Sequence, residues 1–326
     1  MTILITGGAG YIGSHMVYAA LDRGKDVVVL DNLSTGNRSL VAEKAHFHQG
    51  EVSDQVTLRR LMSYYRVTAV IHFAGSIVVP ESVEKPLAYY LNNTVASRNL
   101  IETCVEMGVK NFIFSSTAAV YGMPESNPVT ETAPLAPINP YGRSKLMTEW
   151  MLEDASRAYD FRYVALRYFN VAGGDPEGRT GQSTPRATHL IKRACQAALG
   201  RIPYLDIFGT DFPTKDGTGV RDYIHVTDLV AAHALALEHL EKGGASLVAN
   251  CGYGHGFSVR EVVDTVSKVV GHRVPTREAP RRLGDAAELV ADSSKIKGAL
   301  SWKPGHDDLE EIVTAAYAWE RRLNAA

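Results

Sequence analysis

The stretch TILITGGAGYIG, residues 2–13, decides the fold, because an apolar run leads directly into a glycine-rich turn. Gly7 permits a tight turn, Gly10 lets the backbone approach a pyrophosphate, and Gly13 lets the following helix pack close to the sheet. The unpaired N–H groups and the positive dipole at the start of that helix favour an anion there. The spacing is G-x-x-G-x-x-G rather than G-x-G-x-x-G. The strand before it and the helix after it favour a dinucleotide site over a purely structural turn.

Short apolar runs alternate with segments of helical period through the first 170 residues. Runs that are apolar on both sides indicate a parallel sheet buried on both faces. The sequence therefore predicts a doubly wound α/β (Rossmann) domain over residues 1–170. The expected strands cover residues 3–5, 27–30, 46–48, 69–73, 112–114 and 163–166, and the first helix lies near 12–23.

The texture of the sequence changes after Asn170, where glycine and proline crowd residues 173–181. We expect a smaller C-terminal α/β substrate domain over residues 171–326, with segments near 220–245 returning to the first domain. A strand at 223–226 should lead into a helix that Thr227 caps through its hydroxyl. Further helices are expected near 184–199, 258–270 and 307–323.

The composition excludes several classes of protein. The formal net charge is −2, so no basic field exists to attract nucleic acid or an anionic membrane surface. No apolar run approaches the ~20 residues of a membrane span. The three cysteines, Cys104, Cys195 and Cys251, fit neither a metal-ligand spacing nor a redox pair. With a strand expected from Thr2 and no signal segment before it, we expect a cytoplasmic protein without a metal.

Asp31 indicates which dinucleotide binds. It ends the second expected strand, 18 residues after Gly13, where an acid accepts hydrogen bonds from the adenosine ribose. A carboxylate there repels a 2′-phosphate, so the residues favour NAD over NADP. The alternative is that Asp31-Asn32 only forms a turn.

Tyr141 and Lys145 form a candidate acid/base pair. Asn139 suits an N-cap and Pro140 a first helical residue, so both side chains should lie on one face of a new helix. Ionising the tyrosine near neutral pH means lowering its pKa by roughly 3, or about 4 kcal/mol. A cation about 4 Å away at an effective dielectric near 20 supplies about that much. We expect Lys145 and the positive nicotinamide to provide it.

The stretch SSTAAVYG, residues 115–122, follows the fifth expected strand at its carboxyl end, where α/β sheets bind ligands. A hydroxyl from Thr117 or Ser116 is placed to hold the reacting substrate oxygen beside Tyr141. The alternative is that these hydroxyls bond local backbone in a turn.

These segments together resemble the UDP-glucose 4-epimerases of the extended short-chain dehydrogenase/reductase family, from Ile3 to at least Asp292. The resemblance rests on the glycine loop, Asp31-Asn32, Ser115 to Gly122, Tyr141 to Lys145 and five further motifs. Those motifs are HFAG (72–75), YYLNN (89–93), LRYFN (166–170), GVRDYIHV (219–226) and RRLGD (281–285), with Phe208 matched singly.

The resemblance implies a mechanism in which Tyr141 takes the proton of a sugar 4-hydroxyl while hydride passes from C4 to NAD. The 4-keto sugar then turns about its link to UDP and takes the hydride back on its other face. Thr117 would bond the 4-oxygen, and Lys145 would bond the ribose and tune Tyr141. The implied UDP-hexose contacts are Thr117, Asn170, Phe208, Arg221, Arg282 and Asp285, the arginines suiting a diphosphate. Without the family, Arg221 with Asp222 reads as a surface ion pair.

The implied NAD contacts run along the carboxyl edge of the expected sheet. They are Gly7, Gly10, Tyr11, Ile12, Gly13, Asp31, Asn32, Ser34, Thr35, Gly36, Glu51, Val52, Phe73, Ala74, Gly75, Asn92, Ser115, Tyr141, Lys145 and Phe169.

Three positions depart from the family pattern. Glu51 replaces an aspartate often placed near adenine, and Ile77 replaces a lysine that some members have near the cofactor. Leu289 lies near a gate where a tyrosine in some members excludes N-acetylated sugars.

Four rival functions are weighed. Nucleotide-sugar 4,6-dehydratases and UDP-glucuronate decarboxylases need an acid beside the threonine, and here Ala118 and Ala119 stand there. A UDP-N-acetylhexosamine or UDP-pentose 4-epimerase keeps the same catalytic residues and stays an alternative. A non-catalytic NAD-binding regulator has no use for Tyr141 and Lys145.

Apolar helices near 84–107 and 144–160 correspond to a dimer interface in similar enzymes, so we expect a homodimer.

Overall fold

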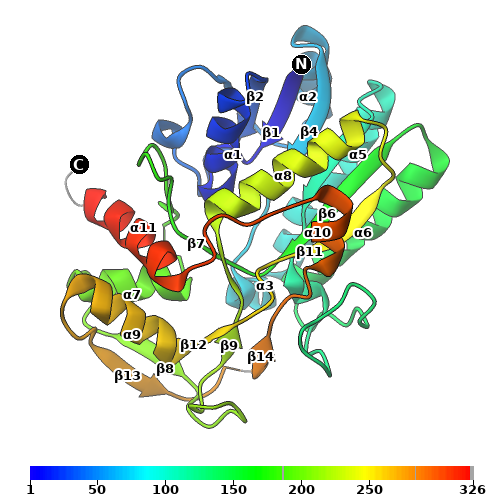
Figure 1. Ribbon diagram of the computed structural model, residues 1–326. Coiled ribbons are helices and arrows are strands. Elements are labelled where there is room, and N and C mark those ends of the chain that lie inside the picture. Colours follow the sequence, from blue (N-terminus) through cyan, green and yellow to red (C-terminus); the bar gives the residue numbers. More distant parts are fainter. Residues whose placement is uncertain (186, 283, 324–326) are drawn as a thin grey trace.

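A parallel sheet forms the centre of the computed structural model, which describes residues 1–185, 187–282 and 284–323 (Figure 1). Its seven described strands run in the order β11-β6-β5-β4-β1-β2-β3, every neighbouring pair parallel. The strand order reverses between β1 and β4, which is the switch point where such sheets bind ligands. The predicted doubly wound α/β class is confirmed. The strands are β1 (Thr2–Thr6), β2 (Asp26–Asp31), β3 (His46–Gln49), β4 (Val67–His72), β5 (Asn111–Ser115), β6 (Arg162–Tyr168) and β11 (Leu247–Cys251).

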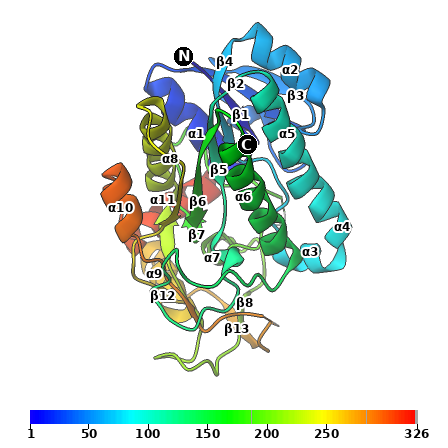
Figure 2. The same ribbon diagram turned by 90° about the vertical axis from the view of Figure 1, so that its right-hand side faces the viewer.

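Each face of the sheet has its own helical layer (Figure 2). Ile3 and Ile5 of β1 join the core beneath α1 and α8, whereas Leu4 joins the core beneath α2, α5 and α6. Burial on both faces is why the strands are continuous apolar runs rather than alternating ones. The helices are α1 (Tyr11–Asp22), α8 (Val226–Glu241), α2 (Gln55–Tyr64), α5 (Ala96–Glu106) and α6 (Pro140–Ala158).

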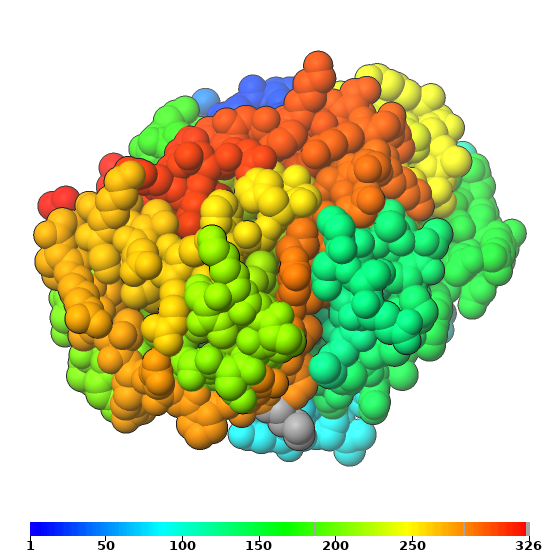
Figure 3. Space-filling view, turned by 60° about the horizontal axis from the view of Figure 1, so that its bottom comes forward, coloured from blue at the N-terminus to red at the C-terminus, as the bar shows by residue number. Residues whose placement is uncertain are grey.

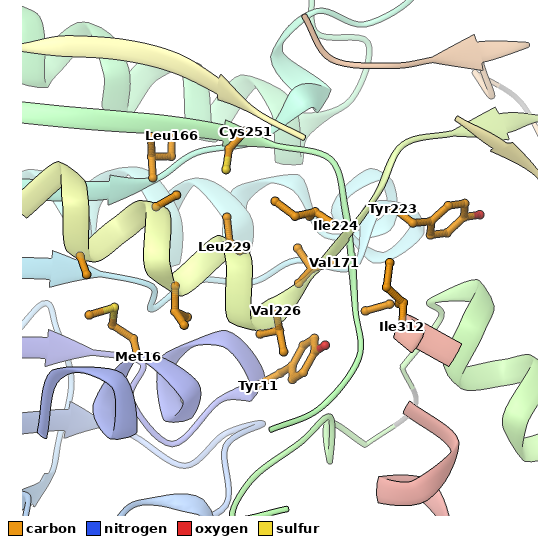
Figure 4. Close-up of a cluster of buried hydrophobic side chains, with 14 of the residues drawn as sticks. Tyr11, Met16, Leu166, Val171, Tyr223, Ile224, Val226, Leu229, Cys251 and Ile312 are labelled. Carbon is orange, nitrogen blue, oxygen red and sulfur yellow. The ribbon is translucent and has the colours of Figure 1, made fainter. Parts of the chain in front are cut away.

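The second half of the chain forms a smaller unit of helices and short strands, and returns to the large sheet through α8 and β11. The two parts share one hydrophobic core. Figure 4 shows Met16 of α1 and Leu166 of β6 in the same cluster as Val171, Val226 and Ile312. The further elements are β7 (Asn170–Ala172), α7 (Leu190–Ala198), β8 (Leu205–Phe208), β9 (Val220–Arg221), β10 (Tyr223–His225), β12 (Phe257–Ser258), α9 (Val259–Val270), β13 (Thr276–Ala279), β14 (Glu288–Leu289), α10 (Ser294–Leu300) and α11 (Leu309–Arg322).

Three helices differ from the sequence prediction. Helix α8 is capped by His225, whose Nδ1 accepts the Thr227 N–H at 3.1 Å, so the predicted Thr227 cap is wrong. The helix expected near 184–199 is shorter, since α7 begins at Leu190; residue 186 lies outside the described residues. The helix expected near 84–107 is interrupted at Pro86, which cannot donate a backbone hydrogen bond. This segment consists of α3 (Val79–Glu84), α4 (Pro86–Tyr89), the π-helix η2 (Tyr90–Val95) and α5. Elsewhere in the chain, short 3-10 turns occur at η1 (Arg38–Leu40) and η3 (Ala118–Val120).

Candidate active site

A cavity of about 740 Å³ opens at the carboxyl ends of β1, β2 and β4, beside the switch point. Two of the predicted cofactor residues, Ser115 and Lys145, are outside its lining. The other predicted cofactor residues all line it, namely Gly7, Gly10, Tyr11, Ile12, Gly13, Asp31, Asn32, Ser34, Thr35, Gly36, Glu51, Val52, Phe73, Ala74, Gly75, Asn92, Tyr141 and Phe169.

The glycine loop forms a cradle that side chains would fill. Gly7 has a φ of +71°, and a Cβ there would lie 2.6 Å from the Ala74 backbone nitrogen. A Cβ at Gly13 would lie 2.1 Å from the Gly7 carbonyl oxygen. Gly10 caps α1 without any side-chain hydrogen bond, which leaves the amides at the helix start for a ligand. The loop therefore fits the pyrophosphate of a dinucleotide.

Asp31 stands at the far side of this cradle. Its carboxylate is buried and accepts the Ala9 N–H at 2.9 Å and the Leu33 N–H at 2.8 Å. Beside it, the Asn32 amide donates to both carboxylate oxygens of Glu51 at 3.2 Å. The two carboxylates give this end of the cavity a negative charge, which fits the hydroxyls of a ribose and repels a phosphate on it.

Tyr141 enters the cavity from the first turn of α6. The Asn139 side chain caps this helix by accepting the Gly142 N–H at 2.9 Å, as the sequence predicts. The Thr117 hydroxyl lies in the same cavity, and its interaction with the Tyr141 phenol opposes the rise in the pKa of that tyrosine. The predicted acid/base group and the predicted oxygen-binding hydroxyl therefore share one cavity.

In the described structure, Lys145 is not among the groups that act on the Tyr141 pKa, and the expected effect of bound NAD stays a prediction. Burial raises the pKa of Tyr141, and the hydrogen bond with Thr117 only partly opposes this effect. Lys145 is buried itself, donates from Nζ to the Ser115 carbonyl oxygen at 3.0 Å, and lies over the Phe114 ring. Burial lowers the pKa of Lys145 to about 8, against the charge of Glu149, which raises it.

The hydroxyls of Ser115 and Ser116 face protein. Ser115 donates to the Tyr168 hydroxyl at 2.8 Å, and Ser116 donates to Glu149 Oε1 at 2.5 Å. Both residues are buried outside the cavity lining. The suggestion that Ser116 holds the substrate oxygen is therefore wrong, because successive residues of an extended strand end point to opposite sides.

The predicted substrate residues fall into two groups. Thr117, Asn170 and Arg221 line the cavity. Phe208, Arg282 and Asp285 lie outside its lining and form a cluster of their own. Arg282 pairs with Asp285 at 2.8 Å and covers the Phe208 ring at 5.0 Å.

Arg221 connects the two groups electrostatically, because burial lowers its pKa while the charge of Asp285 raises it. The ion pair between Arg221 and Asp222 is absent from the described contacts. Asp222 is fully buried and accepts backbone N–H groups from Tyr253, Gly254 and Ala291.

One strand crosses between the loops at the rim of the site. β14 pairs with β9, and Val129 forms a bridge with Ala291. Figure 3 shows the orange segment near residue 290 between the lime loop near 214 and the green loop near 125. Leu289, on this strand, lines the cavity. Leu283, which belongs to the RRLGD motif (281–285), lies outside the described residues.

Several lining residues have no motif in the sequence. Gln182, Thr184, Pro185 and His189 come from the loop before α7. The Gln182 amide donates to Nδ1 of His189 at 2.7 Å, and burial lowers the His189 pKa to about 4, so its Nε2 carries a hydrogen for a ligand. The glycine-rich texture of 173–181 indicates a loop there but not which residues reach the cavity.

The described residues contain neither a cluster that could hold a metal nor a helix that could cross a membrane. Within the described ranges, no cluster of three or more histidine, cysteine or acidic side chains is arranged to hold a metal. In the same part of the chain, no helix is long and apolar enough to cross a membrane.

Residues 3–252 match the NAD dependent epimerase/dehydratase family, and the chain belongs to it. NAD is the cofactor that this family and the glycine cradle define. A UDP-glucose 4-epimerase of Azospirillum brasilense is 58% identical over 98% of this chain and 92% of its own length. The crystal structure of UDP-glucose 4-epimerase from Brucella ovis in complex with NAD is 45% identical, with a TM-score of 0.95 over 98% of each chain. The UDP-Glc/GlcNAc 4-epimerase of Campylobacter jejuni is 50% identical, with a TM-score of 0.86 over 98% of this chain and 99% of its own.

Proposed function

We propose that the protein is an NAD-dependent 4-epimerase that interconverts UDP-galactose and UDP-glucose. The observation that carries this proposal is that Tyr141 and Thr117 line the cavity that also holds the glycine cradle. Relatives that cover nearly the whole chain are named UDP-glucose 4-epimerases, which supports the same substrate.

Each side chain has a defined task in this reaction. Thr117 donates a hydrogen bond to the sugar 4-oxygen, and Tyr141 takes the proton of the 4-hydroxyl and later returns it. Bound NAD supplies a reversible hydride acceptor for C4 of the sugar, and its positive ring favours the ionised tyrosine. Lys145 holds the Ser115 carbonyl beside the reacting groups and contributes a positive charge.

UDP is assigned to the second-half side of the cavity. Asn170, Arg221 and His189 line it there, and the guanidinium of Arg221 suits a diphosphate. We propose that Phe208, Arg282 and Asp285 complete the uridine end, although they lie outside the cavity lining. Anchoring at UDP leaves the sugar free to turn and present its other face to the same tyrosine.

Isotopic labelling tests this mechanism. UDP-galactose carrying deuterium at C4 should give UDP-glucose that retains the label at C4 in ordinary water. Tyr141→Phe should lose turnover, by about 100- to 10,000-fold, because it removes the acid/base group. Exchange of the label with solvent, or full turnover by Tyr141→Phe, would contradict the assignment.

A wider substrate range is the second candidate function. Leu289 lines the cavity, and the Campylobacter jejuni relative is named for both UDP-Glc and GlcNAc substrates. Epimerisation of UDP-N-acetylhexosamines or UDP-pentoses keeps Tyr141 and Thr117 in the same tasks. Leu289→Tyr should lower kcat/KM for UDP-N-acetylgalactosamine more than for UDP-galactose, since the larger ring occupies space; equal losses would refute this reading.

Three rival functions are less well supported. Ala118 and Ala119 line the cavity where dehydratases and decarboxylases need an acid, so the described site offers no such group beside Thr117. A non-catalytic NAD-binding regulator leaves Tyr141 and Thr117, which line the same cavity, without a task.

We also propose a cytoplasmic homodimer. Exposed apolar side chains follow one face of α3 to η2 at four-residue spacing, with Val83 63%, Leu87 79% and Leu91 63% exposed. Trp150 of the adjacent helix α6 is 53% exposed. Sedimentation should give a species of twice 35.5 kDa at micromolar concentration, and Leu91→Lys should dissociate it. A wild-type monomer would count against the dimer.

We further propose that the domain division follows the binding sites. Residues 1–170, with returning segments near 220–245, bind NAD, and residues 171–326 bind the UDP-sugar. In the described structure, α8 and β11 pack with the large sheet although they come from the second half of the chain. A single cut in the chain therefore does not separate the two parts.

A further inference from the structure

A buried ion pair lies directly behind the catalytic residues. Glu149 is on α6, two helical turns after Tyr141, and Arg167 is on β6. Arg167 donates to Glu149 from Nε at 3.0 Å and from Nη2 at 2.5 Å, and both side chains are only 5% exposed. No step of the proposed reaction uses either group. Two charges taken out of water cost several kcal/mol each, so such a pair is weak evidence for stability alone.

Glu149 also contacts the strand end that carries Thr117. Its Oε1 accepts the Ser116 hydroxyl at 2.5 Å. One turn earlier on α6, Lys145 donates to the Ser115 carbonyl oxygen at 3.0 Å, and a turn before that Tyr141 interacts with Thr117. Three residues at four-residue spacing on α6 thus contact three consecutive residues at the end of β5.

We propose that Glu149, held by Arg167, is a positioning residue that fixes the Ser116 turn and thereby the place of Thr117 beside Tyr141 and Lys145. This inference rests on the proposed epimerase function. Ser116 points away from the cavity because its hydroxyl binds Glu149, and the next side chain, Thr117, then points into it.

Arg167 extends the same network to the far side of the turn. Its Nη1 donates to the Tyr121 hydroxyl at 3.0 Å, and that hydroxyl donates to Asn250 Oδ1 at 2.7 Å. The turn η3 between Thr117 and Tyr121 is therefore tied at both ends to one guanidinium and its carboxylate. The planar guanidinium of arginine holds its hydrogen-bond donors in a fixed arrangement, so arginine suits this task better than lysine.

The same carboxylate acts on Lys145 through charge. The groups that interact electrostatically with Lys145 are Glu149 on its own helix and His72 on β4, which is itself held neutral by burial. Glu149 faces Arg167, and the charge of Glu149 also acts on Tyr121 and Tyr163. Removal of the Glu149 charge would lower the Lys145 pKa below its value of about 8.

Glu149→Gln and Ser116→Ala separate the two effects. Ser116→Ala removes only the link to the turn, and kcat should fall about tenfold with KM for UDP-galactose within twofold. Glu149→Gln should lower kcat about 100-fold and move the alkaline limb of its pH profile down by about one pH unit. The matched control is Glu153→Gln on the same helix, which breaks only the exposed pair with Arg157 and should keep wild-type kcat.

The variant Glu149→Gln can unfold, because it leaves Arg167 buried without its partner. The double variant Glu149→Leu with Arg167→Met avoids this by removing both charges together. A folded double variant should still lose turnover about 100-fold. Wild-type kcat in Ser116→Ala and in the folded double variant, with an unchanged alkaline limb in the double variant, would overturn the proposal. Absence of turnover in the wild-type protein would instead refute the proposed function.

Discussion

Acid should destabilise this protein well above the range in which most carboxylates titrate. Four buried histidines and the half-buried His189 have depressed pKa values, because removal from water opposes their charged form. The pKa is lowered to about 4 for His15, His189 and His233, and to about 3 for His72 and His225.

The sign of the effect follows from proton uptake. In the unfolded chain each histidine has a pKa of about 6.5, so between about pH 4 and 6.5 the unfolded state binds more protons. The free energy of unfolding therefore rises with pH across this window. The protein becomes progressively less stable as the pH falls below about 6.5. At pH 5.5 each histidine costs about 1 kcal/mol, or roughly 5 to 7 kcal/mol for the five, against a typical total of 5 to 15.

Urea unfolding followed by circular dichroism between pH 5 and 8 measures this directly. The pH dependence of the unfolding constant should correspond to an uptake of about four to five protons near pH 5.5. His233→Met should lower that number by about one, because His233 is buried against the Phe73 ring. The exposed His272→Gln is the matched control. Stability that stays flat from pH 8 to 5.5 would refute the reasoning.

Two further predictions concern buried carboxylates. Asp222→Asn should lower the free energy of unfolding by about 2 to 4 kcal/mol in urea titrations, because an amide cannot accept all three backbone N–H groups that Asp222 binds; an unchanged midpoint would show that these bonds matter little. Asp31→Asn should reduce the preference for NAD over NADP at least about tenfold, since it removes the charge that repels a 2′-phosphate. Dissociation constants of both nucleotides for stripped protein check it, and an undiminished ratio would contradict that role of Asp31.

Local signals in the sequence were enough for the fold and the chemical centre. The apolar strand before Gly7 and the helix after it come from neighbouring residues, so their geometry is written in a short segment. The same holds for the Asn139 cap that begins α6 and places Tyr141. These features depend on backbone conformation, which short-range sequence determines well.

Features that depend on distant packing were not predictable. The direction of Ser116 is set by Glu149, 33 residues away, and the lining by His189 depends on how a loop folds back. The Tyr141 pKa was predicted from its neighbour at i+4, whereas burial by the whole fold dominates it. Phe208, Arg282 and Asp285 came from the resemblance, and their separate cluster is visible only in three dimensions.

Turnover of UDP-galactose by the purified protein with no NAD added tests the central claim most directly. We predict formation of UDP-glucose, because we expect the cradle at Gly7, Gly10 and Gly13 to keep NAD bound through purification. UDP-N-acetylgalactosamine and UDP-arabinose measured in parallel give the substrate range. No conversion of any of the three, even after NAD is supplied, would contradict the proposed epimerase function.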